Sequence, residues 1–338
     1  MLYKELVIID NEKISKKGDS FYCDNFEAKI SEEFKIFFNV TVIARKSKIN
    51  RACQINLEKI KIASNIFSFL FNIFKTFKKK NTNYLIIAIN PYTFFACLLL
   101  LLYRKKIFIY LRSDGYEEYR AILGFLGPII YHIMFKIVTF KTKIITCQKR
   151  LFIKGNSNLV FPSELNSFWI DNKQKSLLDK PRLLYVGRMK IEKGIFSLLK
   201  IFNEIKTDAE LTIVGRKENI NYDNKKIKCI GPIYDSKELI KIYDDHNIFI
   251  LPSFTEAHPK VVDESLSRAR PVIIFNEIEH IIQNKKGIFV SKRNTKSLLE
   301  TIDYVIKNYI SIQESIIQNK LPTKKEFISQ MINILNSN

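Results

Sequence analysis

The sequence predicts an α/β protein built from two doubly wound parallel-sheet domains, and three observations support this. The chain has 338 residues, 46% of them hydrophobic and 26% charged, a globular composition long enough for two cores. Short apolar runs alternate with helical patterns along the second half, as they do in βαβ units. The polar, turn-rich stretch 156–180 interrupts this pattern, and we expect the connection between the domains there.

The second half gives the clearer succession of elements. Its predicted strands are short aliphatic runs, and its predicted helices carry apolar residues three or four positions apart. Strand and helix alternate, which favours a parallel sheet. We expect strands at 182–186, 211–214, 228–230, 248–251 and 272–275, and helices at 195–205, 236–243 and 259–268.

The first half suggests a second doubly wound domain through weaker signals. Helical stretches separate its apolar runs, so a parallel sheet is again expected. Open parallel sheets bind ligands at the carboxyl ends of their strands. The predicted strands are 6–9, 40–43, 84–89, 107–111 and 144–147.

Charge and cysteine content restrict the partners and the compartment. The net charge is +21, and residues 41–110 carry 13 lysines and arginines against Glu58 alone. Such an excess suits a polyanion, which here means nucleic acid, anionic lipid or a phosphate-bearing substrate. Five cysteines without a CxxC pair indicate a reducing compartment and no zinc site.

The apolar runs are too short to cross a membrane. The longest, 92–103, has 12 residues, whereas a spanning helix needs about 20. The first residues, MLYKELVIIDNEK, do not read as a secretion signal. We therefore expect a soluble or peripheral protein in the cytoplasm.

The strongest chemical signal is LLYVGRMKIEKG, residues 183–194. A buried strand ends at Gly187, Arg188 leaves the sheet, and a helix opens near Lys193. Two cations at the mouth of a parallel sheet are suited to neutralising a diphosphate. On spacing alone, a solvated turn between strand and helix explains the segment equally well.

A second signal, LPSFTEAHPKVVDE at residues 251–264, also begins where a strand ends. Pro259 suits the first helical position, so the backbone from His258 through Lys260 to Val261 would present N–H groups to phosphate. Glu256 before the helix and Glu264 within it are candidate acceptors for sugar and ribose hydroxyls. Taken alone, two glutamates eight residues apart are a weak signal.

Together these segments resemble the family 4 glycosyltransferases of the GT-B fold, in which two Rossmann-like domains face a cleft. The second domain of that family reads approximately V-G-R-L-x-x-E-K-G, then I-V-G, then P-S-x-x-E-G-x-P-x-x-x-x-E-A-x-A-x-G-x-P-V. This chain has VGRMKIEKG at 186–194, IVG at 213–215 and PSFTEAHPKVVDESLSRARPV at 252–272. The resemblance covers 180–275 by motif and the first half by architecture only.

The resemblance implies a role for each matching residue. Arg188 and Lys193 would bind the diphosphate of the donor, Glu256 the transferred sugar, and Glu264 the ribose. The backbone at His258, Pro259, Lys260 and Val261 would hold the phosphates. Arg188, Lys193 and Glu256 would thus form the catalytic set.

Glycine positions add to the donor site and also depart from the family pattern. Gly187 and Gly215 are donor-side positions, and Gly215 would let the chain pass close to the nucleotide. The family glycine after the first glutamate is Ala257 here, and the glycine of A-x-G-x-P-V is Ala269. If either position needs a positive φ, we expect weaker donor binding.

In the first domain only weaker candidates stand out. Arg112 and Asp114, in LRSDGYEEYR after a strand, are candidates for contacts to the donor phosphate or the acceptor hydroxyls. Gly18, in SKKGDS, is a candidate for a loop that approaches the donor. A surface turn explains these residues as well.

The resemblance also assigns the domains. Residues 1–160 would form the acceptor-side domain and residues 165–321 the donor domain. The final helix, expected at about 324–335 within 322–338, would pack back on the first domain, as that family's chain does.

The function expected is that of a retaining glycosyltransferase. It would move a hexose from a nucleotide-diphosphate sugar to a hydroxyl of a lipid-linked or cell-surface polysaccharide acceptor. No Asp-x-Asp occurs in the chain, so we expect no metal and no cofactor. The alternatives are another GT-B enzyme, such as a sugar-nucleotide epimerase, and a non-catalytic basic protein that binds membrane or nucleic acid.

A lipid-linked acceptor would place the protein at the inner face of the membrane. Residues 62–80 set Ile62, Ile66, Phe69/Leu70, Ile73 and Phe77 on one helical face before three lysines, as interfacial helices do. We therefore expect an anionic membrane, and not nucleic acid, as the polyanionic partner. A core-packed helix has the same periodicity.

Overall fold

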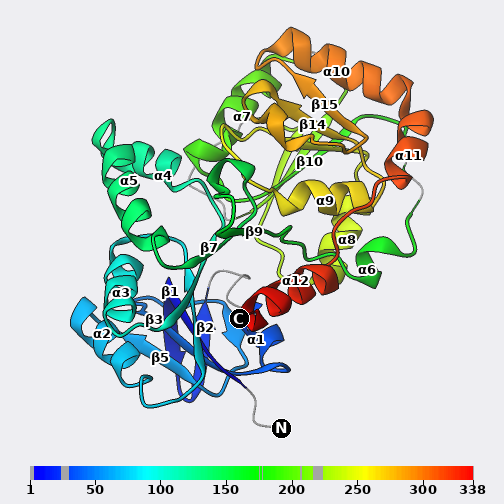
Figure 1. Cartoon of the computed structure of the whole chain (residues 1–338). Helices are drawn as coiled ribbons and strands as arrows, with labels where there is room; N and C mark the ends of the chain where they lie inside the picture. The colour runs from blue at the N-terminus through cyan, green and yellow to red at the C-terminus, as the bar shows by residue number, and fades with distance from the viewer. Residues whose placement is uncertain are drawn as a thin grey trace. The chain divides into compact units, whose positions relative to one another are not determined.

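The structure is a computed structural model that divides into two compact units (Figure 1). Unit 1 comprises Met1–Phe161 with Glu326–Asn338, and unit 2 comprises Pro162–Lys325. Each unit contains a sheet with parallel strands, so the expected α/β class is confirmed. The residues described are 4–23, 30–174, 176, 178–205, 208–215 and 224–337.

Unit 2 contains a six-stranded sheet in the order β12-β11-β10-β13-β14-β15, with every pair parallel. In chain order this is 3-2-1-4-5-6, the order of the Rossmann fold, which reverses between its first and fourth strands. The strands are β10 (Arg182–Val186), β11 (Glu210–Val214), β12 (Ile227–Ile230), β13 (Ile248–Leu251), β14 (Val272–Phe275) and β15 (Ile288–Ser291).

Helices cover this sheet because each carries an apolar stripe. In α7 the residues Ile195, Leu198, Leu199 and Phe202 recur at helical spacing, and all four are buried. They join the strands in one core cluster. The helices are α6 (Ser167–Ile170), α7 (Ile195–Glu204), α8 (Ser236–Asp244), α9 (Lys260–Ser267), α10 (Thr295–Lys307) and α11 (Tyr309–Ile317), with short 3-10 helices η3 (Ile191–Lys193) and η4 (Asn276–Ile281).

Unit 1 contains a nine-stranded sheet whose parallel part runs β5-β3-β1-β6-β7-β8-β9. Strand β1 continues beyond this part and pairs with β2 in an antiparallel hairpin, which β4 extends. The strands are β1 (Lys4–Lys17), β2 (Ser20–Cys23), β3 (Phe38–Lys46), β4 (Cys53–Ile55), β5 (Ile60–Ala63), β6 (Thr82–Ile87), β7 (Lys106–Leu111), β8 (Lys143–Thr146) and β9 (Ser157–Leu159).

Both faces of the sheet in unit 1 are covered, because side chains of one strand alternate between two cores. Val7 and Ile9 of β1 belong to the core under α2, α3 and α5, whereas Leu6 and Ile8 belong to the opposite core. The helices are α1 (Ile30–Phe34), α2 (Ile66–Phe74), α3 (Pro91–Leu102), α4 (Gly115–Leu123), α5 (Leu126–Thr139) and α12 (Lys324–Asn336).

The final helix α12 packs in unit 1. Its residues Phe327, Met331 and Leu335 are buried in the same core as Leu6. The Nδ2 of Asn83 on β6 also donates to the carbonyl oxygen of Leu335 at 2.7 Å. From the sequence we expect this helix to pack against the first domain.

The stretch 156–180 is not a plain connection, which corrects one expectation. Its first part forms β9 in unit 1, and Trp169 of α6 is buried in the core of unit 2. Arg268 fastens the segment after α6, because its Nη1 donates to the carbonyl oxygens of Trp169 and Asp171. The division between the units falls after Phe161.

The prediction of a helix over 62–80 is also wrong, both in the length of the helix and in the side of it that is exposed. Ile62 lies in strand β5, and the helix α2 begins at Ile66 behind an Asn65 cap. The side chains of Phe69 and Ile73, on the predicted membrane face, are buried in the core. The apolar periodicity of this segment therefore reflects packing into the core, which was the alternative to a membrane-facing helix. No described helix is long and apolar enough to cross a membrane.

Candidate active site

The three residues of the expected catalytic set lie on two adjacent loops of unit 2. Strands β10 and β13 pair directly, with Leu183 opposite Ile248, and they flank the point where the strand order reverses. The loop after β10 carries Arg188 and Lys193, and the loop after β13 carries Glu256. Ligands of doubly wound sheets bind at the carboxyl ends of the strands at this reversal. The motifs thus meet where the fold makes a binding site.

An ion pair joins the two loops. Lys193 Nζ lies 2.6 Å from Glu256 Oε1, and both side chains are largely shielded from solvent, at 22% and 11% exposure. Ser253 Oγ donates to the same carboxylate oxygen at 2.7 Å. The backbone N–H of Phe254 donates to the carbonyl oxygen of Glu192 at 3.0 Å. The ammonium and carboxylate are therefore held at a fixed separation before any ligand arrives.

Glycines allow the loops to approach this closely. Gly194 has φ +65°, and a Cβ there would lie 1.8 Å from the carbonyl oxygen of Pro252. A Cβ on Gly215 would lie 2.1 Å from the carbonyl oxygen of Gly187. Side chains are therefore excluded at Gly194 by both backbone conformation and space, and at Gly215 by space. Gly187 and Gly215 help to form the site through their packing.

Arg188 is exposed beyond the end of β10. Its carbonyl oxygen accepts a hydrogen bond of 2.9 Å from the hydroxyl of Tyr185, which fixes the start of the loop. Burial, followed by the charge of Glu256, raises the pKa of Tyr185, so this hydroxyl stays protonated. In the described part of the chain no carboxylate pairs with the Arg188 guanidinium, which leaves it available to an anion.

Sequence reasoning missed Arg293, which ties the loop after β13 to the rest of the unit. Its Nη2 donates to the carbonyl oxygen of Pro252 at 2.9 Å, and its Nε to Glu277 at 2.7 Å. The guanidinium also lies 4.1 Å from the ring centroid of Phe254. Arg293 stands outside the family motifs, so no local signal pointed to it.

His280 is a second residue whose position only the structure reveals. Its Nε2 lies 2.8 Å from the carbonyl oxygen of Glu256. A carbonyl oxygen only accepts, so Nε2 carries the proton and donates. His280 thus positions the backbone of the residue expected to face the sugar.

The helix α9 begins one residue later than expected. Pro259 is its cap, and Lys260 is its first residue. Amides of a first helical turn point out of the helix and favour an anion. The expected phosphate site on the backbone around His258 to Val261 therefore keeps its geometric basis, with Pro259 contributing no N–H.

The imidazole of His258 is turned into the protein. Its Nε2 lies 3.1 Å from Asp263 Oδ2, and the two side chains are 3% and 1% exposed. Lys285 Nζ lies 2.7 Å from Asp263 Oδ1. Burial alone would raise the pKa of Asp263, but His258 and Lys285 outweigh it and lower that pKa. The His258 side chain thus stabilises the start of α9.

Glu264, the expected ribose acceptor, is buried in the second turn of α9. Its Oε2 accepts from the hydroxyl of Tyr243 at 3.0 Å. Burial raises the pKa of Glu264 to about 7, although Tyr243 and Lys260 act in the opposite direction. Because this carboxylate titrates near neutrality, the affinity of any ligand that it binds depends on pH.

The two alanines in place of family glycines differ in conformation. Ala269 has φ +55°, whereas Ala257 is not among the described residues with positive φ. Ala269 follows the end of α9 and is 5% exposed. An L-residue in this region carries strain of about 1–2 kcal/mol, so the departure at Ala269 has a structural cost.

Replacing Ala269 with glycine is expected to stabilise unit 2. Relief of the strain exceeds the conformational entropy that glycine adds to the unfolded chain, which costs roughly 0.5–1 kcal/mol. We expect a gain of about 0.5–1 kcal/mol in the free energy of unfolding, measured by denaturant titration. Ala257→Gly is the control and should lower it. If Ala269→Gly lowers the free energy of unfolding as much as Ala257→Gly does, or more, Ala269 is unstrained.

In unit 1 the weaker candidates have local structural roles. Gly18, with φ +58°, lies in the turn between β1 and β2. Asp114 caps α4 by accepting from the backbone N–H of Tyr116 at 2.9 Å, and it pairs with Arg150 at 2.9 Å. Neither observation supplies a contact to a ligand.

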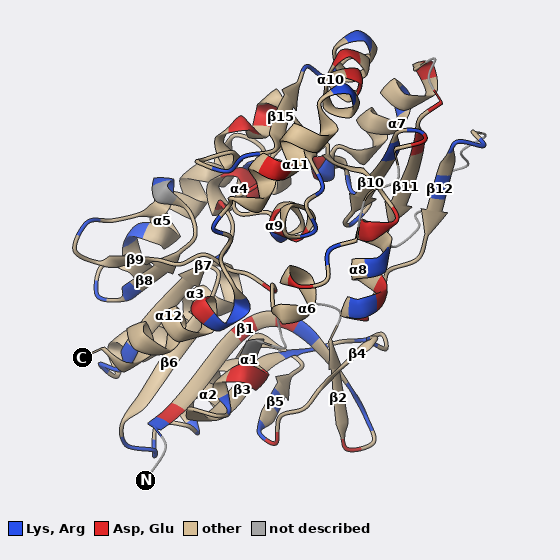
Figure 2. Ribbon diagram, turned by 90° about the vertical axis from the view of Figure 1, so that its right-hand side faces the viewer, with Lys and Arg blue, Asp and Glu red and all other residues tan. Residues whose placement is uncertain are grey.

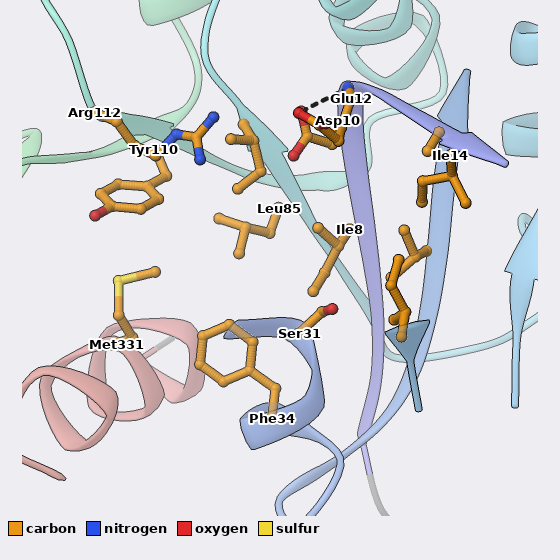
Figure 3. A pocket seen from close by; sticks show the side chains of 14 residues that line it. Ile8, Asp10, Glu12, Ile14, Ser31, Phe34, Leu85, Tyr110, Arg112 and Met331 are labelled. Carbon is orange, nitrogen blue, oxygen red and sulfur yellow. Dashed lines mark hydrogen bonds between the residues drawn. The ribbon is translucent and has the colours of Figure 1, made fainter. Parts of the chain in front are cut away.

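Arg112 lines a pocket near the carboxyl ends of β6 and β7 and of the part of β1 that pairs in parallel with β6 (Figure 3). Asp10 and Glu12 lie at the same end of the pocket, and the rest is mostly apolar. Unit 1 thus offers charged groups at its own strand ends, at the reversal between β1 and β6. The lining continues with Ile8, Ile14, Ser31, Phe34, Val42, Ala44, Ile55, Leu85, Ile87, Tyr110 and Met331.

Comparison with known proteins connects this site to a family. Residues 180–308 match the model of the glycosyl transferases group 1. The chain is 27% identical over 201 residues to the capsular polysaccharide biosynthesis glycosyltransferase CapM of Staphylococcus aureus, a match spanning 53% of this chain and 51% of CapM. It is 22% identical over 173 residues to the N,N'-diacetylbacillosaminyl-diphospho-undecaprenol alpha-1,3-N-acetylgalactosaminyltransferase of Campylobacter jejuni, spanning 48% and 45%.

These matches span about half the length of the relatives. The fold likeness extends further. Anabaena HepE, whose structure holds UDP and glucose, superimposes with a TM-score of 0.67 at 12% identity over 99% of this chain and 100% of HepE. At that identity the likeness is one of fold. The family match covers the two loops that carry Arg188, Lys193 and Glu256, so residues 180–308 are similar to the glycosyl transferases group 1 in the region of this site.

Proposed function

We propose that this protein is a retaining glycosyltransferase that moves a hexose from a nucleotide-diphosphate sugar to an acceptor hydroxyl. The observation that carries the proposal is the ion pair between Lys193 and Glu256 at the reversal of the sheet in unit 2. A donor bound there would meet one cation beside its diphosphate and one carboxylate beside its sugar. The group 1 match over 180–308 supports the same activity.

The chemistry requires stabilisation of a departing diphosphate and of a developing oxocarbenium ion. Arg188, Lys193 and the N-terminus of α9 would neutralise the diphosphate, and the Glu256 carboxylate would face the sugar. Positioned charges are sufficient, so no covalent nucleophile is needed. The departing phosphate would take the proton of the acceptor hydroxyl. We propose that these cations take the place of a metal ion and that the donor is the only small molecule required.

We propose a lipid-linked or cell-surface polysaccharide as the acceptor, such as a capsule, exopolysaccharide or lipopolysaccharide precursor. CapM is a capsular polysaccharide enzyme, and the Campylobacter relative carries a diphospho-undecaprenol acceptor in its name. Such acceptors lie at the cytoplasmic face of a membrane, and we propose a peripheral location there.

Incubation with nucleotide sugars and a lipid-linked oligosaccharide extract tests the proposal. We expect nucleoside diphosphate release that depends on the acceptor, a product that keeps the anomeric configuration of the donor by NMR, and activity that persists in excess EDTA. Epimerisation of the nucleotide sugar without acceptor would contradict a transferase. Loss of activity in EDTA, restored by magnesium, would contradict the role of the cations.

Donor binding should depend on the ionisation of Glu264. The ionised carboxylate accepts two ribose hydroxyls, whereas the protonated form loses acceptor capacity. Because the pKa of Glu264 is about 7, affinity for a nucleotide sugar should rise as pH increases from 6 to 8. Isothermal titration measures this, and the diester diphosphate of a nucleotide sugar does not titrate in that range.

The matched control is Glu264→Gln, which keeps the shape and removes the ionisation. Its affinity should be weaker at pH 8 and should not change between pH 6 and 8. A wild-type affinity that is flat over this range would remove Glu264 from the ribose site.

A further inference from the structure

Three neighbouring helices of unit 1 expose apolar side chains that the fold does not use. Helix α3 packs between α2 and α5 (Figure 1), and the inner faces of all three contribute to one core cluster. Their outer faces therefore point away from that core. We call these outer side chains the apolar face: Phe67, Phe71 and Phe74 of α2, Phe95 and Leu102 of α3 with the adjoining Tyr103, and Ile129, Ile130, Ile133 and Ile137 of α5 with the adjoining Phe140.

Helix α5 shows the feature most clearly. Its inner stripe, with Tyr131, Phe135 and Val138, is buried, as expected of a surface helix. Its opposite stripe is also apolar, and Ile133 is 55% exposed. A helix that is apolar on its outer face as well as its inner face is ordinarily covered on both, and α5 has only 14 residues, too few to span a bilayer.

Helix α2 repeats the pattern with aromatic side chains. Phe67, Phe71 and Phe74 stand at positions i, i+4 and i+7, and Phe67 is 80% exposed. This stripe is opposite the one on which the sequence analysis based its membrane prediction, since Phe69 and Ile73 are buried. Exposed apolar groups gathered on adjacent elements mark an interaction surface.

The three helices of the apolar face, together with the loops that follow them, carry basic residues and no carboxylate, whereas Glu117 and Glu118 lie on α4, which packs against α5. No aspartate or glutamate occurs between Lys59 and Ser113 or between Tyr119 and Ser163, so α2, α3, α5 and the loops that follow them carry no carboxylate. Figure 2 accordingly shows α5 in tan and blue only. Lys75 Nζ lies 4.3 Å from the Phe71 ring centroid, and Lys141 Nζ lies 5.6 Å from that of Phe140.

We propose that the apolar face is a docking surface for an anionic phospholipid bilayer. Aromatic and aliphatic side chains would enter the headgroup and acyl boundary, while the lysines reach lipid phosphates, as in helices that lie in a membrane interface. A second copy of the chain is a poorer occupant, because each copy has a net charge of +21 and the face has no carboxylate to pair with a lysine. This proposal rests on the proposed function in one respect only, namely that the acceptor is bound to a membrane.

Sedimentation with phosphatidylcholine vesicles, with and without phosphatidylglycerol, tests the surface. We expect the full chain to bind the anionic vesicles and to be partly released by salt. Ile133→Asp with Ile137→Asp should weaken the partition coefficient at least about tenfold, because each isoleucine loses its burial in lipid. Ile310→Asp, at a 69% exposed position of α11 in unit 2, is the matched control and should bind as wild type does.

A gain of signal provides the second measurement. The only tryptophan, Trp169, is buried, so an added tryptophan reports on its own surroundings. The fluorescence emission of the Ile133→Trp variant should shift to the blue on anionic vesicles and be quenched by brominated lipid. The emission of the Ile310→Trp variant should show neither change. An unquenched Ile133→Trp or unaltered binding of the double aspartate variant would overturn the proposal. A wild-type dimer in solution that becomes a monomer in the double aspartate variant would also overturn the proposal.

Donor turnover without vesicles separates this proposal from the proposed function. With the lipid-linked oligosaccharide extract dispersed in detergent, the double aspartate variant should release nucleoside diphosphate at the wild-type rate. Vesicle binding as expected, with no acceptor-dependent turnover of any nucleotide sugar, would refute the transferase and leave the docking surface. Turnover without vesicle binding would refute the surface alone.

Discussion

Replacing Lys193 with alanine is expected to reduce sugar transfer about 10- to 100-fold while the protein remains folded. A hydrogen bond to a charged group is worth roughly 1.5–3 kcal/mol, and Lys193 would make one to the departing diphosphate. The side chain is 22% exposed, so its loss opens the site to water without leaving a cavity. Initial rates of nucleoside diphosphate release measure the effect.

Lys190→Ala is the matched control, three residues earlier on the same loop. Its side chain is 48% exposed, and its ammonium lies 3.8 Å from Glu192, so activity should hardly change. The transfer activity of Arg188→Ala should fall as much as that of Lys193→Ala. If Lys193→Ala turns over as fast as Lys190→Ala, the assignment of the diphosphate to this loop is wrong.

Asp244→Asn is expected to cost about 3–5 kcal/mol in the free energy of unfolding, the range for breaking a buried ion pair. Asp244 Oδ2 lies 2.7 Å from Nη2 of Arg268, and Oδ1 lies 3.7 Å from Arg270, with both arginines 1% exposed. Neutralising the aspartate leaves two buried guanidinium groups without a carboxylate. Burial already lowers the pKa of Arg270.

The neighbouring Asp245→Asn is the control, because Asp245 is exposed and such substitutions usually stay within about 0.5 kcal/mol. Denaturant unfolding of both variants provides the measurement. Equal losses at the two positions would mean that the arginines are held by the backbone carbonyls of the 169–174 segment and not by Asp244.

Strands of the two parallel sheets could be predicted from the sequence because each is a short apolar run. Parallel strands that are buried on both faces are nearly continuous apolar runs. The strands predicted at 182–186 and 248–251 coincide with β10 and β13. The edge strands β5, β9 and β15 gave no such signal. Ile60–Ala63 alternates with lysine, and its Ile62 stands four residues before Ile66, so the run was assigned to the following helix.

The candidate site could be predicted only where its residues share a local motif. Arg188, Lys193 and Glu256 each follow a strand at a characteristic spacing. The contact of His280 with Glu256 and that of Arg293 with Pro252 join elements distant in sequence, and only the folded chain brings them together. Nor does the sequence distinguish Arg268 from a surface arginine, since its burial depends on Asp244 and the carbonyls after α6.

The central claim is that the loops after β10 and β13 bind a nucleotide-diphosphate sugar through Lys193, and thermal unfolding in the presence of EDTA tests it most directly. A ligand at 100 times its Kd stabilises the folded state by about 2.7 kcal/mol. We predict that at least one nucleotide sugar raises the Tm of the wild-type protein and of Lys190→Ala, and raises that of Lys193→Ala markedly less. If no nucleotide sugar shifts the wild-type Tm, or if Lys193→Ala shifts equally, the claim is contradicted.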